Sequence, residues 1–271
     1  MKKRALRVLV CLALCFTLAS PAYATESSVT VTVNGTAIET GFASQVLDNQ
    51  TYVSYLPIVT ALYPDATAVW ANNQAEVTAP GLKLCIKPEA KYIVANGRYL
   101  YVPDGVKVDG NHILVPVRTL CQALGAQVTW DAATYTVSIT AGTGPIASGD
   151  SYYNSDDLYW LSRIIYAESG NQSLEGKIAV GNVVLNRVAS SLFPNSVYDV
   201  VFQRNQFTPA SNGSIKRTPN DESVIAAKLC LDGANTAGNA LYFVNPKVSP
   251  NSWAARNRTY VATIGAHAFF A

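Results

Sequence analysis

The sequence is poor in the residues that build metal and thiol sites. Its 271 residues include two histidines, His112 and His267, which lie in different halves of the chain. A zinc amidase or metallopeptidase site built on paired histidines is therefore not expected. The chain also lacks a G-x-S-x-G motif, a Walker loop and a dinucleotide fingerprint. We predict that the protein binds no metal ion and needs no cofactor.

Cysteine is sparse as well. Two of the five cysteines lie in the hydrophobic N-terminus, which leaves Cys85, Cys121 and Cys230. An odd and sparse set argues against a disulfide framework, although one bridge stays open. Cys230 and His267 could form a thiol–imidazole pair, but the pattern of residues 223–231 is helical. A small buried thiol is the better interpretation of Cys230.

Long hydrophobic runs are absent except at the N-terminus, which resembles a signal peptide. Four basic residues at positions 2–7 precede an apolar run at 8–19. The sequence A-Y-A at 22–24 then places small residues at the two positions that a signal peptidase recognises. We predict cleavage after Ala24, so that residues 1–24 are removed and the protein is secreted. The alternative is an uncleaved anchor, but the run is short for a bilayer, and no other segment is long enough to cross one.

Neither sign of charge dominates the mature chain. Removal of residues 1–24 takes away four basic residues and no acidic ones, which turns 20 basic against 18 acidic residues into 16 against 18. No basic block is left. Strong electrostatic capture of nucleic acid is therefore not indicated.

One carboxylate stands out by its surroundings. Leu158, Leu161, Ile165 and Glu168 follow one another at spacings of three, four and three, so a helix places all four on one face. Burial of that face would raise the pKa of the Glu168 carboxyl group and leave it a proton donor near neutral pH. The alternative is that Gly170 marks a frayed helix end, where Glu168 is solvated and inert.

The sequence around Glu168 resembles a known family. Residues 165–188 read I-Y-A-E-S-G-N-Q-S-L-E-G-K-I-A-V-G-N-V-V-L-N-R-V, and further motifs follow at 193–208, 240–246 and 264–269. In this order they resemble the cell-wall hydrolase family typified by the spore cortex-lytic enzyme SleB, over about residues 156–271. The family usually has a small residue, often alanine, after the glutamate, and this chain has Ser169, a modest departure.

The resemblance implies a lysozyme-like, helix-rich α+β catalytic domain that cleaves the glycan strands of peptidoglycan, in spore cortex or cell wall. It also implies that Glu168, in the family's A-E motif, is the catalytic acid. A glycosidase that uses two carboxylates needs the second carboxyl group within roughly 5 to 9.5 Å of the first. The sequence shows no obvious candidate for this second carboxylate. Glu175 is nearest in sequence, but its place in a first helical turn after Ser173 explains it structurally.

A single glutamate suffices if the substrate supplies the nucleophile. In a lytic transglycosylase, the acid protonates the glycosidic oxygen and then, as a base, removes the proton of the muramoyl 6-hydroxyl. The sequence therefore favours transglycosylation between N-acetylmuramic acid, or muramic lactam, and N-acetylglucosamine. Two alternatives stay open: a muramidase-type hydrolase that positions a water molecule, and a non-catalytic protein that binds the cell wall.

Polar and aromatic residues could hold the sugar strand. Asn186 and Arg187 interrupt an apolar helical run, so they either face the cleft or serve structure, Arg187 in an ion pair and Asn186 as a cap of a neighbouring strand or loop. Gln206, Phe207 and Thr208 resemble the family's Q-F-S/T segment, which would line the groove, with Phe207 stacked on a sugar.

Tyr242 and Asn245 complete the predicted binding residues. They belong to a short strand whose alternation puts Tyr242 and Val244 on one side and Phe243 and Asn245 on the other. Trp253 is a candidate for the rim of the groove. For the aromatic residues, packing in the core is the alternative.

The region before the catalytic half contains an internal repeat. Three features recur after 60 or 62 residues: Asn34-Gly35 and Asn96-Gly97, Ala61-Leu62 and Ala123-Leu124, Trp70 and Trp130. Each unit reads as an N-G hairpin, an apolar strand, a short helix and a strand pair. Two such units predict one compact α+β domain.

Residues 113–131, I-L-V-P-V-R-T-L-C-Q-A-L-G-A-Q-V-T-W-D, resemble the N-terminal domain of copper amine oxidase. The resemblance implies an accessory domain over residues 26–141, without catalysis or copper, which either contacts a cell-wall polymer or serves as a spacer or folding aid. The Gly, Ser and Pro content of the segment that follows predicts a flexible linker at 142–154, so that this domain and the catalytic domain at 155–271 move independently.

Overall fold

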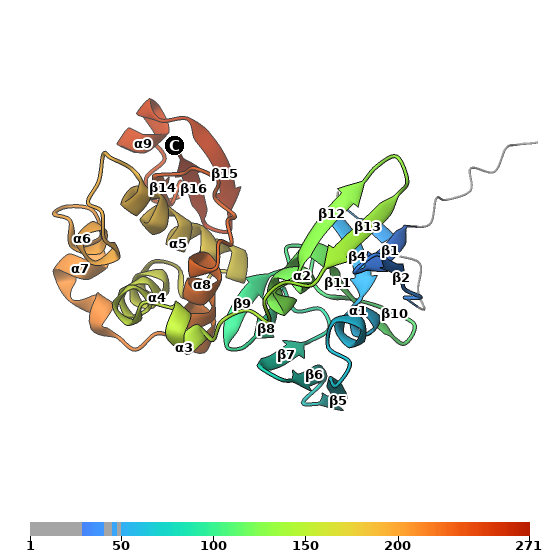
Figure 1. The fold of residues 1–271 in the computed structure, drawn as a ribbon. Helices are drawn as coiled ribbons and strands as arrows, with labels where there is room; N and C mark the ends of the chain where they lie inside the picture. Colours follow the sequence, from blue (N-terminus) through green and yellow to red (C-terminus); the bar gives the residue numbers. More distant parts are fainter. Residues whose placement is uncertain (1–28, 41–44, 48–49) are drawn as a thin grey trace, which may run out of the picture.

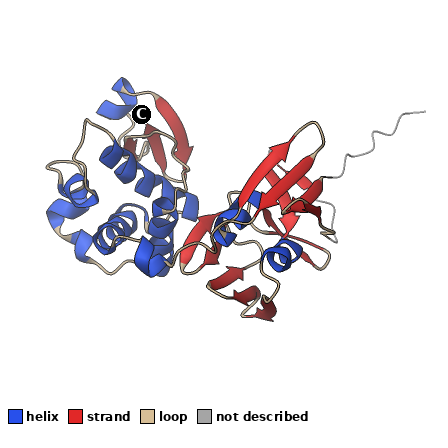
Figure 2. Cartoon of the chain, in the orientation of Figure 1, coloured by secondary structure: helices blue, strands red, loops and turns tan. Residues whose placement is uncertain are grey.

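The computed structural model describes residues 29–40, 45–47 and 50–271. The predicted signal peptide at 1–24 lies outside the described residues. A strand-rich N-terminal half and a helix-rich C-terminal half lie side by side (Figures 1 and 2). The predicted α+β class is confirmed.

The described N-terminal half forms three sheets, with the strand orders β12-β13-β1-β2, β10-β11-β4-β3 and β5-β6-β7-β8-β9. β1 and β13 pair in parallel, although they come from opposite ends of this half. This pairing joins the beginning of the domain to its end. The strands are β1 (Thr30–Val33), β2 (Thr36–Ala37), β3 (Gln45–Leu47), β4 (Gln50–Ser54), β5 (Thr67–Ala71), β6 (Gln74–Ala79), β7 (Leu82–Ile86), β8 (Tyr92–Ala95), β9 (Arg98–Tyr101), β10 (Lys107–Asp109), β11 (His112–Pro116), β12 (Gln127–Asp131) and β13 (Thr136–Thr140).

Both N-G pairs form two-residue hairpin turns with positive φ angles, between β1 and β2 and between β8 and β9. Further along, β4 leads into α1 (Tyr55–Leu62) and the hairpin β5–β6, while β11 leads into α2 (Val117–Leu124) and the hairpin β12–β13. The elements thus follow in the order that the sequence predicts. That the two units are a repeat stays a prediction.

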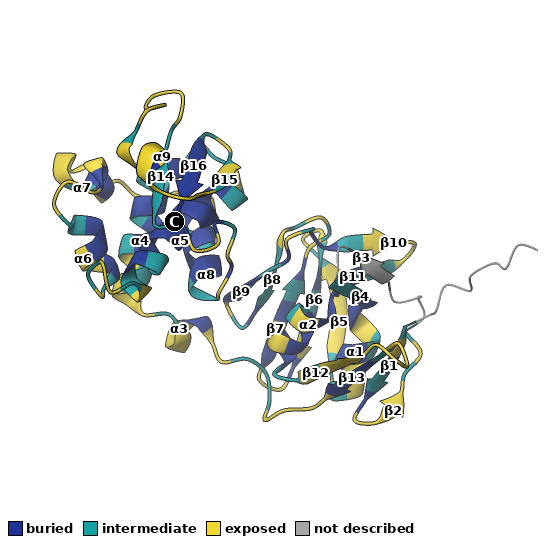
Figure 3. Cartoon of the chain, turned by 90° about the horizontal axis from the view of Figure 1, so that it is seen from above, coloured by how far each residue is buried: buried dark blue, intermediate teal, exposed yellow. Residues whose placement is uncertain are grey.

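The two halves bury separate cores (Figure 3). In the N-terminal half, the alternation of β7 sends Leu82, Leu84 and Ile86 inward, where each is almost fully buried. In the C-terminal half, helices α4, α5 and α8 pack on one another. Its helical elements are α3 (Gly149–Tyr152), α4 (Ser155–Ser169), α5 (Leu174–Ala189), α6 (Val197–Phe202), α7 (Thr208–Asn212), the 3₁₀ helix η1 (Ser214–Lys216), α8 (Asp221–Leu231) and α9 (Trp253–Asn257).

A glycine sets how closely these helices approach. A Cβ atom on Gly181 of α5 would lie 2.6 Å from the sulfur of Cys230 and 2.9 Å from Cδ1 of Ile165, so a larger residue at this position would push the helices apart. Cys230 is buried in α8, its thiol contacts the carbonyl oxygen of Ile178 at 3.4 Å, and burial raises the pKa of the thiol. The interpretation as a buried thiol agrees with this setting.

A small antiparallel sheet closes the C-terminal half. Its order is β14-β16-β15, formed by β14 (Tyr242–Val244), β15 (Tyr260–Ile264) and β16 (His267–Phe270). All four residues of β16 are buried, because the strand is central and both of its faces are covered: Ala268 and Phe270 pack with Ala254 of α9. Phe269 joins the helical core directly.

The halves meet at the β8–β9 hairpin and α8. Arg98 of β9 donates from Nε to a carboxylate oxygen of Asp232 at 2.9 Å, and the two side chains form an ion pair. The hydroxyl of Tyr153 donates to the other oxygen of Asp232 and accepts from the backbone N–H of Tyr99 at 3.1 Å. Tyr92 and Tyr99 pack against the core of the C-terminal half.

The segment between the halves makes hydrogen bonds to the β8–β9 turn. The side-chain amide of Asn96 donates to the carbonyl oxygen of Ile146 at 2.7 Å. The backbone carbonyl oxygen of Asn96 accepts from the N–H of Gly149 at 2.8 Å. Helix α3 begins at the second contact. The β8–β9 turn supplies these partners, which composition does not reveal, and the flexibility of the linker at 142–154 stays a prediction. Within the described part of the chain, no helix is long and apolar enough to cross a membrane.

Candidate active site

Helix α4 carries Glu168 in its last turn. The helix begins after Asn154, whose side chain accepts hydrogen bonds from the N–H groups of Asp156 and Asp157. Leu161 and Ile165 are fully buried on the face that leads to Glu168, which is itself half-buried. The predicted helix and its inward face are confirmed.

Glu168 is not paired with a cation among the described residues. Among the described residues, no side chain forms an ion pair or hydrogen bond with its carboxylate. Burial raises the pKa of this carboxyl group, because the surrounding protein solvates the charged form poorly. The predicted direction is confirmed, and the group is suited to hold a proton near neutral pH.

Glu168 opens on a shallow pocket of about 400 Å³. Tyr166, Gly170 and Asn171 line it from the end of α4 and the following turn, and Arg217 and Asn220 line it from the segment before α8. The last two are separated from Glu168 by about fifty residues of sequence. Sequence reasoning missed both, since only the packing of α4 against η1 and α8 brings them there.

A buried lysine braces the turn after Glu168. Lys177 is 1% exposed, and its ammonium group donates to the carbonyl oxygen of Gln172 and pairs with Glu222 at the start of α8. The side chain of Gln172 accepts from the N–H of Ala266 at 2.9 Å, in the β15–β16 turn. This network ties the turn to α8 and to the sheet. The only hint in the sequence is a lysine within an apolar run.

Two neighbouring carboxylates, Glu175 and Glu222, have cationic partners. Ser173 caps α5 as predicted, with Glu175 in the first turn, and Glu175 pairs with Lys91 of the N-terminal half. Burial is the largest single influence and would raise the pKa of Glu175, but hydrogen bonds from Lys91, the backbone and Ser173, together with the charge of Lys91, outweigh it and lower the pKa. Among the residues that line the described pocket, Glu168 is the only carboxylate.

The structure gives Asn186 and Arg187 structural contacts. The Asn186 side chain donates to the carbonyl oxygens of Gly238 and Ala240, both at 2.9 Å. Arg187 is buried and donates from Nε to the carbonyl oxygen of Leu241 at 2.8 Å, and burial lowers its pKa to about 10. These contacts favour the structural alternative, with Asn186 capping a loop. Arg187, however, binds a carbonyl group and not a carboxylate.

The remaining predicted binding residues do not line the Glu168 pocket either. Phe207 is 6% exposed and packs against Phe243, whereas Gln206 and Thr208 are exposed at the start of α7. Tyr242 and Asn245 are half-buried at β14. For Phe207 the contacts favour the core alternative. A binding role for the group stays a prediction.

The guanidinium group of Arg187 lies among three aromatic rings. Its guanidinium carbon lies 4.8 Å from the ring centroid of Phe193, 5.1 Å from that of Phe207 and 5.5 Å from that of Tyr242. Tyr242 in turn contacts Trp253 edge to face. The cluster fixes α5, α7 and β14 relative to one another.

In the described part of the chain, no three His, Cys, Asp or Glu side chains gather to hold a metal ion.

Two family matches divide the chain. Residues 171–270 match the family described as Cell Wall Hydrolase, and residues 32–139 match the family described as Copper amine oxidase N-terminal domain. The first match begins three residues after Glu168. The two matches fall in the helix-rich half and the strand-rich half respectively.

Curated relatives resemble part of the chain. A spore cortex-lytic enzyme of Oceanobacillus iheyensis is 35% identical over 130 residues, which cover 48% of this chain and 46% of the relative. A spore cortex-lytic enzyme of Bacillus cereus is 36% identical over 117 residues, which cover 43% of this chain and 45% of the relative. The chain thus spans less than half the length of each.

Solved structures also resemble part of the chain. The catalytic domain of the germination-specific lytic transglycosylase SleB from Bacillus anthracis is 34% identical, with 46% of this chain and 100% of that domain covered and a TM-score of 0.42. The catalytic domain of Bacillus cereus SleB is also 34% identical, with 48% of this chain and 100% of that domain covered and a TM-score of 0.42.

Proposed function

Because the C-terminal half of the chain belongs to the cell wall hydrolase family and the N-terminal half to the copper amine oxidase N-terminal domain family, we propose that this protein cleaves the glycan strands of peptidoglycan. One observation carries the proposal within the structure. Glu168 is a half-buried carboxyl group with a raised pKa and no cationic partner among the described residues, and it faces an open pocket. Such a group can protonate a leaving oxygen.

The single carboxylate of the pocket favours a lytic transglycosylase. Protonated Glu168 gives its proton to the glycosidic oxygen as the bond between N-acetylmuramic acid and N-acetylglucosamine breaks. The resulting carboxylate then takes the proton of the muramoyl 6-hydroxyl, whose oxygen attacks the anomeric carbon and closes a 1,6-anhydro ring. Glu168 ends protonated, ready for the next bond, and no water is consumed.

The substrate follows from the relatives and stays part of the proposal. Those relatives are named spore cortex-lytic enzymes, so cortex peptidoglycan, with or without muramic lactam, is the first substrate to test and vegetative cell wall the second. Secretion by way of the predicted signal peptide would bring the protein to either polymer. A muramidase-type hydrolase would need a water molecule and a second base at the same pocket.

Mass spectrometry of the released muropeptides tests the proposal. The mature protein is incubated with purified cortex and with vegetative peptidoglycan, beside Glu168→Gln and, as a matched control, Glu175→Gln. Anhydro-muramoyl ends that vanish only in Glu168→Gln support a transglycosylase. Reducing ends would show a hydrolase. No product from either polymer, with folded protein, would favour a non-catalytic wall-binding protein.

A further inference from the structure

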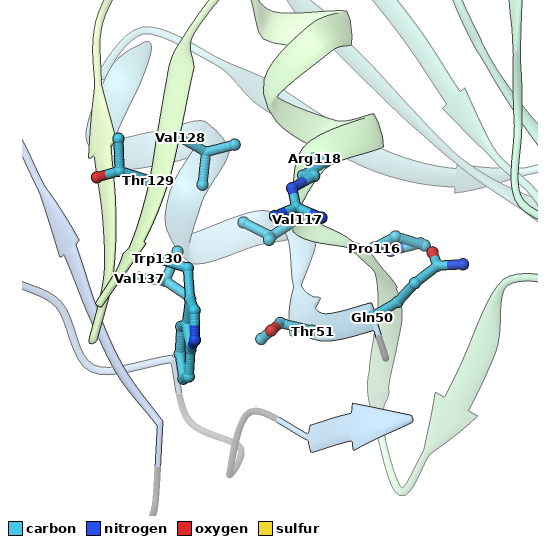
Figure 4. Close-up of a pocket in the computed structure, with 9 residues that line it drawn as sticks. All are labelled: Gln50, Thr51, Pro116, Val117, Arg118, Val128, Thr129, Trp130 and Val137. Atoms are coloured by element: carbon cyan, nitrogen blue, oxygen red, sulfur yellow. The ribbon is translucent and has the colours of Figure 1, made fainter. Parts of the chain in front are cut away.

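The N-terminal half contains a pocket of about 560 Å³ that the proposed reaction does not use (Figure 4). It lies between the start of β4, the end of β11, the first turn of α2 and the β12–β13 hairpin. Trp130 stands on one side and Arg118, Pro116 and Gln50 on the other. The pocket is therefore built by three separate stretches of the fold.

Trp130 offers an aromatic wall. Its side chain is 39% exposed, although β12 holds its backbone in register with Val137. Tyr135 contacts the indole ring edge to face, with centroids 5.9 Å apart and planes at 90°. Buried Val117 and Val137 line the pocket as well. A ring held in one orientation over an apolar floor suits the flat C–H face of a sugar.

The opposite side of the pocket is polar and positively charged. Arg118 is exposed and forms no ion pair with any described residue. The first turn of α2 opens on the same side, and its N-cap residue Pro116 provides no side-chain hydrogen bond. Gln50 adds a neutral hydrogen-bonding group on the same side. A ligand with a carboxylate and several hydroxyl or amide groups matches this side.

We propose that this pocket binds a carboxylate-bearing glycan, with a sugar ring against Trp130 and its carboxylate on Arg118. The choice of peptidoglycan as this glycan rests on the proposed function. Its lactyl and peptide substituents carry carboxylates and amides on a sugar backbone. Because Arg98, Asp232 and Tyr153 fix the two halves to each other, a strand held here raises the local concentration of substrate at the catalytic half.

Co-sedimentation with insoluble peptidoglycan tests the wall. The whole mature chain is used with Glu168→Gln as background, so that turnover does not consume the polymer. Trp130→Ala is expected to weaken binding about tenfold, in keeping with the loss of one aromatic contact. Trp70→Ala is the matched control, because Trp70 is also exposed on a hairpin strand, β5, but does not line the pocket. Thermal melting of each variant shows that it folds.

Two results would overturn the inference at this step. Unchanged binding by folded Trp130→Ala would show that the indole is not a contact. Equal losses in Trp130→Ala and Trp70→Ala would show that exposed tryptophans adhere unspecifically. If Trp130→Ala does not fold, Trp130→Phe replaces it in the binding assay. Quenching of tryptophan fluorescence by soluble disaccharide-peptides is then measured as well, and absence of saturable quenching would refute the site.

A second experiment tests the charge. Arg118→Gln should bind native peptidoglycan several-fold more weakly than the background protein does, and the difference should disappear on peptidoglycan whose carboxylates have been amidated. A loss that persists on the amidated polymer would refute the carboxylate contact. The test is separate from catalysis: Trp130-dependent binding without turnover by the unmutated enzyme would defeat the proposed function alone, and turnover with Trp130-independent binding would defeat this inference alone.

Discussion

The C-terminal half uses its carboxylates in opposite ways at two places. At the end of α4, Glu168 is half-buried and pairs with no cation among the described residues, although Arg217 lines the same pocket. Where the halves meet, the Asp232 side chain is 1% exposed, yet Arg98 pairs with it and Tyr153 donates to it. Burial is common to both places, and the partner is what differs.

The difference teaches how one residue type serves two purposes. Burial without a partner favours the protonated form, so the group stores a proton that chemistry can use. Burial beside an arginine pairs the carboxylate with a cation and ties two domains together. Glu175 lies between these cases, partly exposed and paired with Lys91. Substitutions at Glu168, Asp232 and Glu175 each change one of these places alone.

The largest effect is expected at Glu168. Glu168→Gln keeps the shape of the side chain but removes the proton, so the rate of glycan cleavage should fall between about 10²- and 10⁴-fold, the range of general acid catalysis. Folding should survive, because no described partner is lost. Initial rates on a fixed amount of peptidoglycan, beside thermal melting, measure both. A folded variant with more than a tenth of the activity would contradict the role.

Breaking the contact between the halves should cost stability. Asp232→Asn leaves the guanidinium of Arg98 buried without its counter-charge, which typically costs about 3–5 kcal/mol. Urea denaturation of the mature chain measures the free energy of unfolding. Asp109→Asn is the control, because Asp109 is exposed and forms no ion pair with a described residue, and its change should stay within about 0.5 kcal/mol. Equal effects would mean that the contact contributes nothing.

Local signals in the sequence predicted much of this fold. The spacing of apolar residues placed Glu168 on the inner face of α4, the N-G pairs gave hairpin turns, and Ser173 gave a helix cap. Each of these features depends on neighbours within a few residues. Such features can be read from sequence because local geometry decides them.

Features that depend on tertiary contacts could not be read. Arg217 reaches the Glu168 pocket only through packing of distant elements. For Arg187, the sequence shows a polar residue in an apolar helix but not which carbonyl it binds. For the glycine-rich connection, composition does not show that the side chain of Asn96, about fifty residues away, donates to the carbonyl oxygen of Ile146.

The raised pKa of Glu168 predicts two linked pH effects. Cleavage should fall about tenfold per pH unit above that pKa, because the acid form disappears. For stability, the folded state binds the proton more tightly than the unfolded state, so Glu168 destabilises the fold increasingly as pH rises from its ordinary value of 4.5 to the raised folded value. Glu168→Gln should therefore gain melting temperature relative to the unmutated protein over that window. No gain would mean that the carboxylate is well solvated.

The smallest effect is expected at Glu175. Its pair with Lys91 is partly exposed, with 44% of the Lys91 side chain and 27% of the Glu175 side chain accessible, so Glu175→Gln should cost about 0–1 kcal/mol and less at high salt. The lowered pKa means that this contribution is present above the ordinary carboxyl pKa and is lost as pH falls through the folded one. A double-mutant cycle with Lys91→Met isolates the pair. Cleavage should stay within about twofold, since the carboxylate faces the N-terminal half. A folded Glu175→Gln that loses as much activity as Glu168→Gln would instead make Glu175 the second carboxylate, and the products would then be expected to carry reducing ends.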